Sequence, residues 1–127
     1  MIRYLIDANS SIFAMIDAHS PVNFRIAELE PGEIAISSIS FTEIALGTQL
    51  QKPPPPQVIE AFIAAIPILP FDEGAARTYA TLPFKRARFD RLLAAHALSI
   101  GATVITANVA DFADVPGLQV ENWSKDA

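Results

Sequence analysis

The sequence predicts an α/β fold with a central, mostly parallel five-stranded sheet flanked by helices, in one domain spanning residues 1–127. Short apolar runs alternate with segments whose apolar residues recur at the helical period, which is typical of parallel strands joined by helices. A chain of 127 residues can bury one substantial core and is too short for two. No internal repeat or linker-like segment divides it.

Five short apolar runs are predicted to form the strands. They lie at residues 3–6, 34–37, 67–69, 103–106 and, with a weaker pattern, 118–121. Gly101 precedes the fourth run and is typical of a helix end, so a tight turn should join a helix to this strand.

Helical periodicity fills the segments between the predicted strands. The helices are expected at residues 10–18, 22–29, 41–50, 57–66, 73–82 and 89–100. Four consecutive prolines, 53–56, are interpreted as a stiff connector whose last member opens a helix. The alternative is an extended proline-rich ligand for an aromatic groove.

The charge balance is acidic, with a formal net charge of −5 from 14 acids and 9 bases. This argues against simple electrostatic binding of nucleic acid, because phosphate affinity comes largely from Lys and Arg. Four bases nevertheless fall in the seven residues "KRARFDR": Lys85, Arg86, Arg88 and Arg91. They form either an RNA-binding patch or a solvated helix face.

Apolar residues make up 51% of the chain and mean hydropathy is +0.32, which suggests that a partner covers part of the surface. The longest apolar stretch, "AFIAAIPILPF", has 11 residues and two prolines, too few to cross a bilayer. The absence of Cys excludes disulfides and thiolate metal sites. With no secretory signal pattern at the N-terminus, we expect a cytoplasmic protein.

Four carboxylates stand where an acid is locally unusual: Asp7, Glu43, Asp90 and Asp111. Each has a structural explanation. Asp7 and Asp90 could cap or start helices, and Asp111 could open a turn. "SFTE", Ser40 to Glu43, is a formal capping box in which the serine caps the helix.

The predicted topology, however, brings these acids together. In a parallel sheet the carboxyl ends of the strands share one edge, and that edge binds ligands in open α/β folds. Two carboxylates about 5 Å apart at an effective dielectric near 20 repel by roughly 3 kcal/mol, so a cation should sit among them. Oxygen ligands without Cys or a His pair favour Mg²⁺ or Mn²⁺.

Four segments in order carry a family resemblance: "LIDAN", "ISSISFTEIALG", "DRLLAAHALSIGATVITANVADF" and "VPGLQVENW". With them the chain resembles PIN-domain ribonucleases of the VapC toxin type. The resemblance implies a Mg²⁺- or Mn²⁺-dependent endoribonuclease, a hydrolase that cleaves RNA with a metal-activated water. It also implies a homodimer and a cognate VapB-type antitoxin, as in type II toxin–antitoxin systems.

Carried over by position, the resemblance implies roles for individual residues. The catalytic acids would be Asp7, Glu43, Asp90 and Asp111, of which Asp7, Asp90 and Asp111 would bind metal. Glu43 would either bind metal or orient the water. The supporting polar residues would be Asn9, Thr106 and Asn108. Some members carry Asp at the position of Asn108, which leaves open whether one or two ions bind.

One alternative function stays open: a non-catalytic PIN-like scaffold that binds RNA or protein. A dehalogenase-like phosphatase is strongly disfavoured because Asn9 stands where a second aspartate is needed. His96 is interpreted as a core or interface residue and not as a metal ligand.

Overall fold

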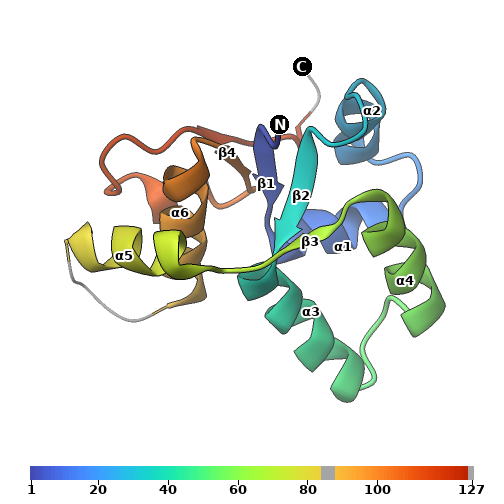
Figure 1. Cartoon of the computed structure of the whole chain (residues 1–127). Coiled ribbons are helices and arrows are strands. Elements are labelled where there is room, and N and C mark those ends of the chain that lie inside the picture. The colour runs from blue at the N-terminus through green and yellow to red at the C-terminus, as the bar shows by residue number, and fades with distance from the viewer. Residues whose placement is uncertain (84–87, 126–127) are drawn as a thin grey trace.

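Five strands in the described part of the chain form one parallel sheet (Figure 1). The structure is a computed structural model that describes residues 1–83 and 88–125. The strands are β1 (Tyr4–Ile6), β2 (Ile34–Ser37), β3 (Ile68–Leu69), β4 (Thr103–Ile105) and β5 (Val120–Glu121). Their order is β3-β2-β1-β4-β5, and each of these pairings is parallel. The predicted fold class is confirmed.

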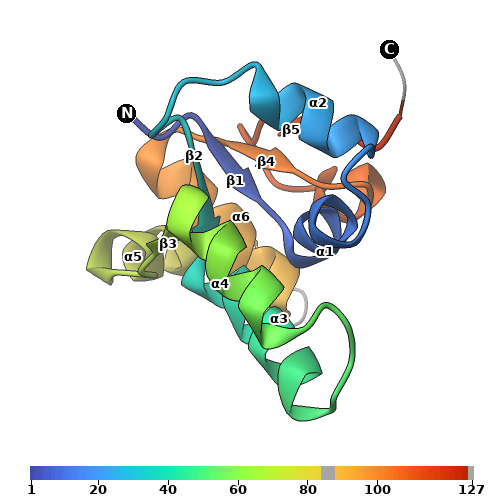
Figure 2. The same cartoon turned by 90° about the vertical axis from the view of Figure 1, so that its right-hand side faces the viewer.

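Helices cover both faces of this sheet (Figures 1 and 2). They are α1 (Ala8–Ile16), α2 (Pro21–Ala27), α3 (Ser38–Gln49), α4 (Pro56–Ala65), α5 (Glu73–Thr81) and α6 (Phe89–Ile100). A short 3₁₀ helix, η1 (Val109–Phe112), follows β4. Within the described residues no helix is long and apolar enough to cross a membrane.

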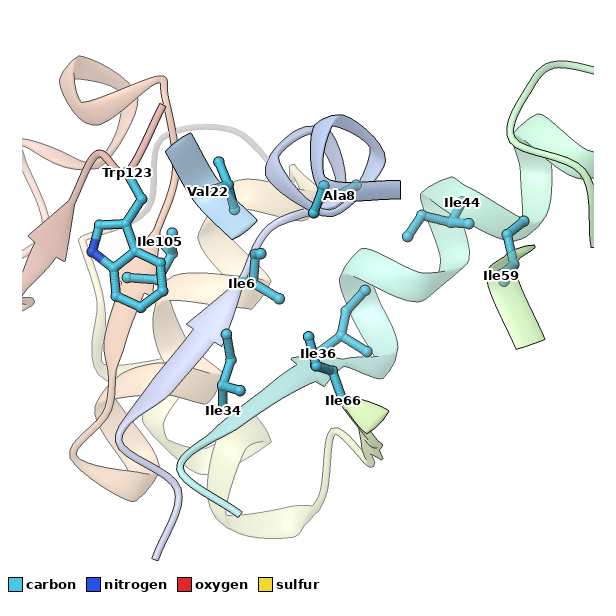
Figure 3. Packing of buried hydrophobic residues seen from close by; sticks show 11 residues of the cluster. Ile6, Ala8, Val22, Ile34, Ile36, Ile44, Ile59, Ile66, Ile105 and Trp123 are labelled. Atoms are coloured by element: carbon cyan, nitrogen blue, oxygen red, sulfur yellow. The ribbon is translucent and has the colours of Figure 1, made fainter. Parts of the chain in front are cut away.

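The alternation of side chains along the strands creates two apolar cores. Ile6, Ile36 and Ile105 face one side of the sheet and pack with side chains of α1 to α4 and with Trp123 (Figure 3). Their neighbours Leu5 and Val104 face the other side, where α6 and η1 cover them. Strands buried on both faces explain the continuous apolar runs in the sequence.

The junction between β2 and α3 has no loop. Ser37 ends the strand and caps the helix, because its Oγ accepts a hydrogen bond from the Ile39 N–H at 3.1 Å. The helix therefore starts three residues before the predicted residue 41, and the predicted capping box is wrong because Ser40 is a buried residue inside α3. Past the sheet, α3 and the loop to α4 project from the body (Figure 2).

Other predicted boundaries agree closely with the structure. α6 spans the predicted residues and ends at Gly101, whose φ of 68° lies in the left-handed region that glycine adopts readily. Pro56 is the first residue of α4, as predicted for the last of the four prolines. These helix ends were predictable because the local chemistry of one residue sets each of them.

Candidate active site

Asp7 links the end of β1 to the start of α1. Its Oδ1 accepts a hydrogen bond from the Ser10 N–H at 2.8 Å, which makes it the N-cap of α1, and its backbone N–H donates to the Ile105 carbonyl at 2.9 Å. The Ser11 hydroxyl donates to the Asp7 carbonyl at 2.8 Å. The capping role considered from the sequence is therefore real, and it also holds a nearly buried carboxylate, 9% exposed, at the carboxyl edge of the sheet.

Glu43 lies in the second turn of α3, beyond the end of β2. Its pKa is raised above the ordinary value, first by burial and then by the negative charges of Asp90 and Asp7. Such electrostatic effects require proximity. Glu43 thus shares one neighbourhood with two acids from other elements.

Asp90 stands in the first turn of α6, and its pKa is also raised. Burial is the main cause, the charges of Asp111 and Asp7 add to it, and Arg88 acts in the opposite direction. Asp111 itself is exposed in η1, where its N–H donates to the Asn108 carbonyl at 3.0 Å. The structure therefore brings together all four carboxyl groups singled out from the sequence.

Two open grooves flank Asp90. One, of about 540 Å³, is lined by Glu43, Arg88, Phe89, Asp90 and Leu92. The other, of about 350 Å³, is lined by Arg88, Asp90, Arg91, Ala110, Asp111, Ala113 and Asp114. An extended substrate could therefore reach the carboxylates from either side.

The donor chemistry of the cluster suits a hard divalent ion. It offers carboxylate oxygens, and the sequence has no Cys to compete with them. Across residues 1–83 and 88–125, no group of three acidic, His or Cys side chains already encloses a position for a metal. The residue types and their proximity fit Mg²⁺ or Mn²⁺.

The three polar residues expected to support the cluster lie on α1 and in the turn after β4. Asn9 is exposed on α1 and, together with Glu43, lines a smaller hollow of about 190 Å³. Thr106 is fully buried, and its Oγ1 accepts from the Asn108 N–H at 3.0 Å. This contact shapes the turn after β4 and so directs the chain toward Asp111.

The basic residues divide into different environments. Lys85 and Arg86 lie outside the described residues. Arg88 is exposed and lines both grooves. Arg91 does not fit the expected RNA-binding role, because it is only 7% exposed and its guanidinium donates to Asp114 Oδ1 at 3.1 Å and to the Pro83 carbonyl. It tethers α6 to two neighbouring segments.

Two features of the site were missed from the sequence. Phe89 presents an apolar surface, 43% exposed, in the larger groove. Lys52 lines the hollow that contains Asn9 and Glu43. No local signal marks Lys52, since the turn after α3 alone brings it back toward the helix. It adds a cation on the α1 side of the cluster.

Comparison with known proteins gives consistent matches over nearly the whole chain. The PIN domain family model matches residues 4–118. The chain is 32% identical over 133 residues to the tRNA(fMet)-specific endonuclease VapC of Shigella flexneri, covering 98% of this chain and all of that protein. Ribonuclease VapC2 of Rickettsia felis is 29% identical over 133 residues, covering 96% and 98%.

Solved structures show the same fold. The DNA-bound VapBC of Salmonella typhimurium contains a chain that matches with a TM-score of 0.80 at 28% identity, over 97% of this chain and 99% of that one. VapBC2 of Rickettsia felis, bound to a promoter fragment, gives 0.80 at 25% identity over the same shares. Because the matches cover 97% of this chain, they include both apolar cores and the carboxyl edge of the sheet.

Proposed function

The chain belongs to the PIN domain family, and from that membership we propose that it is a metal-dependent endoribonuclease, the toxin of a toxin–antitoxin pair. Its curated relatives are named ribonuclease or endonuclease VapC, and its structural neighbours were solved as VapBC complexes. The proposed reaction is hydrolysis of an RNA phosphodiester bond at the carboxylate cluster.

One observation carries this proposal: Glu43 and Asp90 lie among other acids at the carboxyl edge of the sheet. The pKa of Glu43 and that of Asp90 are both raised by neighbouring acids as well as by burial. A fold gains nothing from such crowding in itself, because like charges in a partly buried site are destabilising. A divalent cation bound among the acids would remove this cost.

The proposed roles follow from where each side chain is held. Asp7, Asp90 and Asp111 would bind the metal, and Glu43 would either bind it or orient the attacking water. When bound, Mg²⁺ or Mn²⁺ would supply an activated water and neutralise charge on the scissile phosphate. The cap contact keeps Asp7 fixed, so the cluster is partly organised before the ion arrives. Arg88, between the grooves, would attract the RNA backbone.

The proposed partners are a VapB-type antitoxin and a second copy of the chain. Large apolar side chains are exposed on two parts of the molecule, Phe13, Ile16 and Phe24 on α1 and α2, and Leu46 and Leu50 around the end of α3. Exposed apolar groups of this size are typical of interaction surfaces. Light scattering on the chain alone and on the chain coexpressed with its antitoxin would measure both assemblies.

The test is a cleavage assay on defined RNAs with Mn²⁺, with Mg²⁺ and with EDTA. The panel should include tRNA(fMet), for which the Shigella and Salmonella relatives are named. Asp90→Asn should lower the rate by more than about 100-fold, beyond the effect of residues that only support metal ligands. Glu60→Gln is the matched control, because Glu60 is an exposed acid on α4 outside the cluster.

The competing function is the non-catalytic scaffold. It predicts RNA or protein binding without cleavage, equally in Mn²⁺ and in EDTA. Cleavage that depends on the metal and on Asp90 would exclude it, whereas a well-folded protein that binds RNA and never cuts it would refute the nuclease proposal.

A further inference from the structure

A set of buried and partly buried contacts joins the start of α3 to the middle of α6. Ser37 Oγ and His96 Nδ1 lie 2.7 Å apart, and the His96 ring meets Phe71 edge to face with centroids 5.6 Å apart. The Phe71 N–H in turn donates to Ser38 Oγ at 2.9 Å, which closes the ring of contacts. We call these four residues, Ser37, Ser38, Phe71 and His96, the α3–α6 bracket.

The central hydrogen bond is compatible with a neutral His96 ring. Ser37 Oγ accepts from the Ile39 N–H, and its hydroxyl can either donate to His96 Nδ1 or accept from it, according to the tautomer of the ring. His96 is 1% exposed, and burial lowers its pKa, an effect that the charge of Asp72 partly opposes. A neutral imidazole that is hydrogen-bonded to a serine fits this environment.

On each helix the same number of residues separates the bracket from the acid of the cluster. Glu43 comes six residues after Ser37, and Asp90 comes six residues before His96. α3 leads away from the end of β2, whereas α6 runs back toward the start of β4 (Figure 1). In both helices the step from bracket to acid is about 9 Å, so a shift at the bracket is transmitted to the acids.

Two kinds of buried residue line α6: Arg91 and Leu93 toward its start, and small residues beside His96. Its buried residues near His96 are Ala94, Ala95 and Ala97. Alanines offer few ridges to interlock with a neighbouring helix. The hydrogen bond of His96 is directional and joins groups 59 positions apart in sequence.

We propose that His96 is a positioning residue: through Ser37 it fixes the spacing of α3 and α6 and so keeps Glu43 and Asp90 close to each other in the carboxylate cluster. The identity of the ion rests on the proposed function, whereas the spacing of the helices does not. His96 is too far along α6 to touch the substrate itself.

The test compares two substitutions with different hydrogen-bonding capacity. His96→Phe keeps a ring against Phe71 and removes the Nδ1 hydrogen bond, whereas His96→Asn places an oxygen close to where Nδ1 lies. Because the chain has no Cys, spin labels can be attached at Leu46→Cys on α3 and Phe89→Cys on α6. Distances between the labels are measured without metal, and Mn²⁺ affinity is measured by calorimetry on unlabelled protein.

We expect His96→Phe to broaden the distance distribution and to weaken Mn²⁺ binding about tenfold, the lower end of what groups supporting metal ligands contribute. In cleavage assays it should lower kcat and leave KM for RNA unchanged. His96→Asn should restore all three properties to within about threefold of wild type. Ser37→Ala should broaden the distances and weaken Mn²⁺ binding as His96→Phe does, and it should also lower stability because Ser37 caps α3. Adding His96→Phe to Ser37→Ala should cause no further loss of Mn²⁺ affinity.

A wild-type distance distribution in both His96→Phe and Ser37→Ala would overturn the proposal and leave His96 as a packing residue. So would equal defects in His96→Asn and His96→Phe. If wild-type protein neither binds Mn²⁺ nor cleaves RNA, the proposed function fails instead, and the metal-free distances still decide whether the bracket sets the spacing. If His96→Phe does not fold, Ser37→Ala and His96→Asn provide the same comparison.

Discussion

Two glutamates on either side of β2 have opposite electrostatic surroundings. Glu33 directly precedes the strand, where its Oε1 lies 3.1 Å from Arg3 Nη1 and its Oε2 accepts from the Glu30 N–H at 3.1 Å. These contacts, the backbone hydrogen bond first, lower the pKa of Glu33. In the helix after the strand, the pKa of Glu43 is raised by burial and by two other acids.

The contrast shows that the crowding of acids is local. The same chain provides a cation and a backbone donor for the carboxylate at the amino edge of the sheet, whereas at the carboxyl edge it collects like charges. Sites where like charges are held close together despite their repulsion are candidates for function. The difference between the two edges therefore supports a cation site at one of them only.

The sharpest way to break this comparison is to neutralise one acid at each edge. Asp7→Asn should lower RNA cleavage by more than about 100-fold, because it removes a proposed metal ligand. Glu33→Gln should leave the rate unchanged, because it removes only a surface ion pair. Initial rates with saturating Mn²⁺ provide the measurement, and equal losses in both variants would mean that the two edges do not differ in function.

A smaller effect separates the two roles of Asp7. Asparagine caps helices as well as aspartate does, whereas alanine does not. In EDTA, Asp7→Asn should be at least as stable as wild type, because it keeps the bond to the Ser10 N–H and relieves repulsion. Asp7→Ala should be about 1 kcal/mol less stable than Asp7→Asn in urea unfolding. A clear loss of stability in Asp7→Asn would show that the charge is needed for folding.

The smallest expected effect is in the pH dependence of stability without metal. Raised pKa values mean that folded Glu43 and Asp90 hold protons which the unfolded chain releases above its ordinary values of 4.5 and 3.8. Stability from these two groups should therefore fall as pH rises through their raised pKa values. Glu33 has the opposite sign and stabilises the fold more as pH rises.

The measurement compares wild type with the Glu43→Gln, Asp90→Asn double variant in urea at several pH values. The comparison is needed because His96, whose pKa is lowered, should reduce stability as pH falls below 6.5. That contribution is common to both proteins and cancels in the difference. A difference between them that does not vary with pH would contradict the raised pKa values.

Much of the fold was predictable because local chemistry sets it. The two ends of α6 and the position of β2 agree with the sequence pattern, and the parallel order of strands explains why acids distant in sequence meet. Where prediction failed, a distant or unexpected partner decided the outcome. Arg91 is turned inward by Asp114, 23 residues away, and α3 starts early because Ser37 caps it directly.

The roles of the site residues depend on contacts that no sequence pattern reveals. Asp7 looked like either a cap or a site residue, and the geometry shows that one carboxylate can cap a helix and still face other acids. The hydrogen bond between Ser37 and His96 spans 59 residues and follows no spacing rule. Only the packed arrangement of α3 against α6 brings these side chains into contact.

The loop-free joint between β2 and α3 restricts how this protein can tolerate insertions. A residue added between Ser37 and Glu43 would turn the rest of α3 by about 100° and carry the glutamate away from Asp90. Additions in the turn between α3 and α4 would leave its direction unchanged. The length of the segment from Ser37 to Glu43 is therefore fixed, whereas the length of the turn between α3 and α4 can vary.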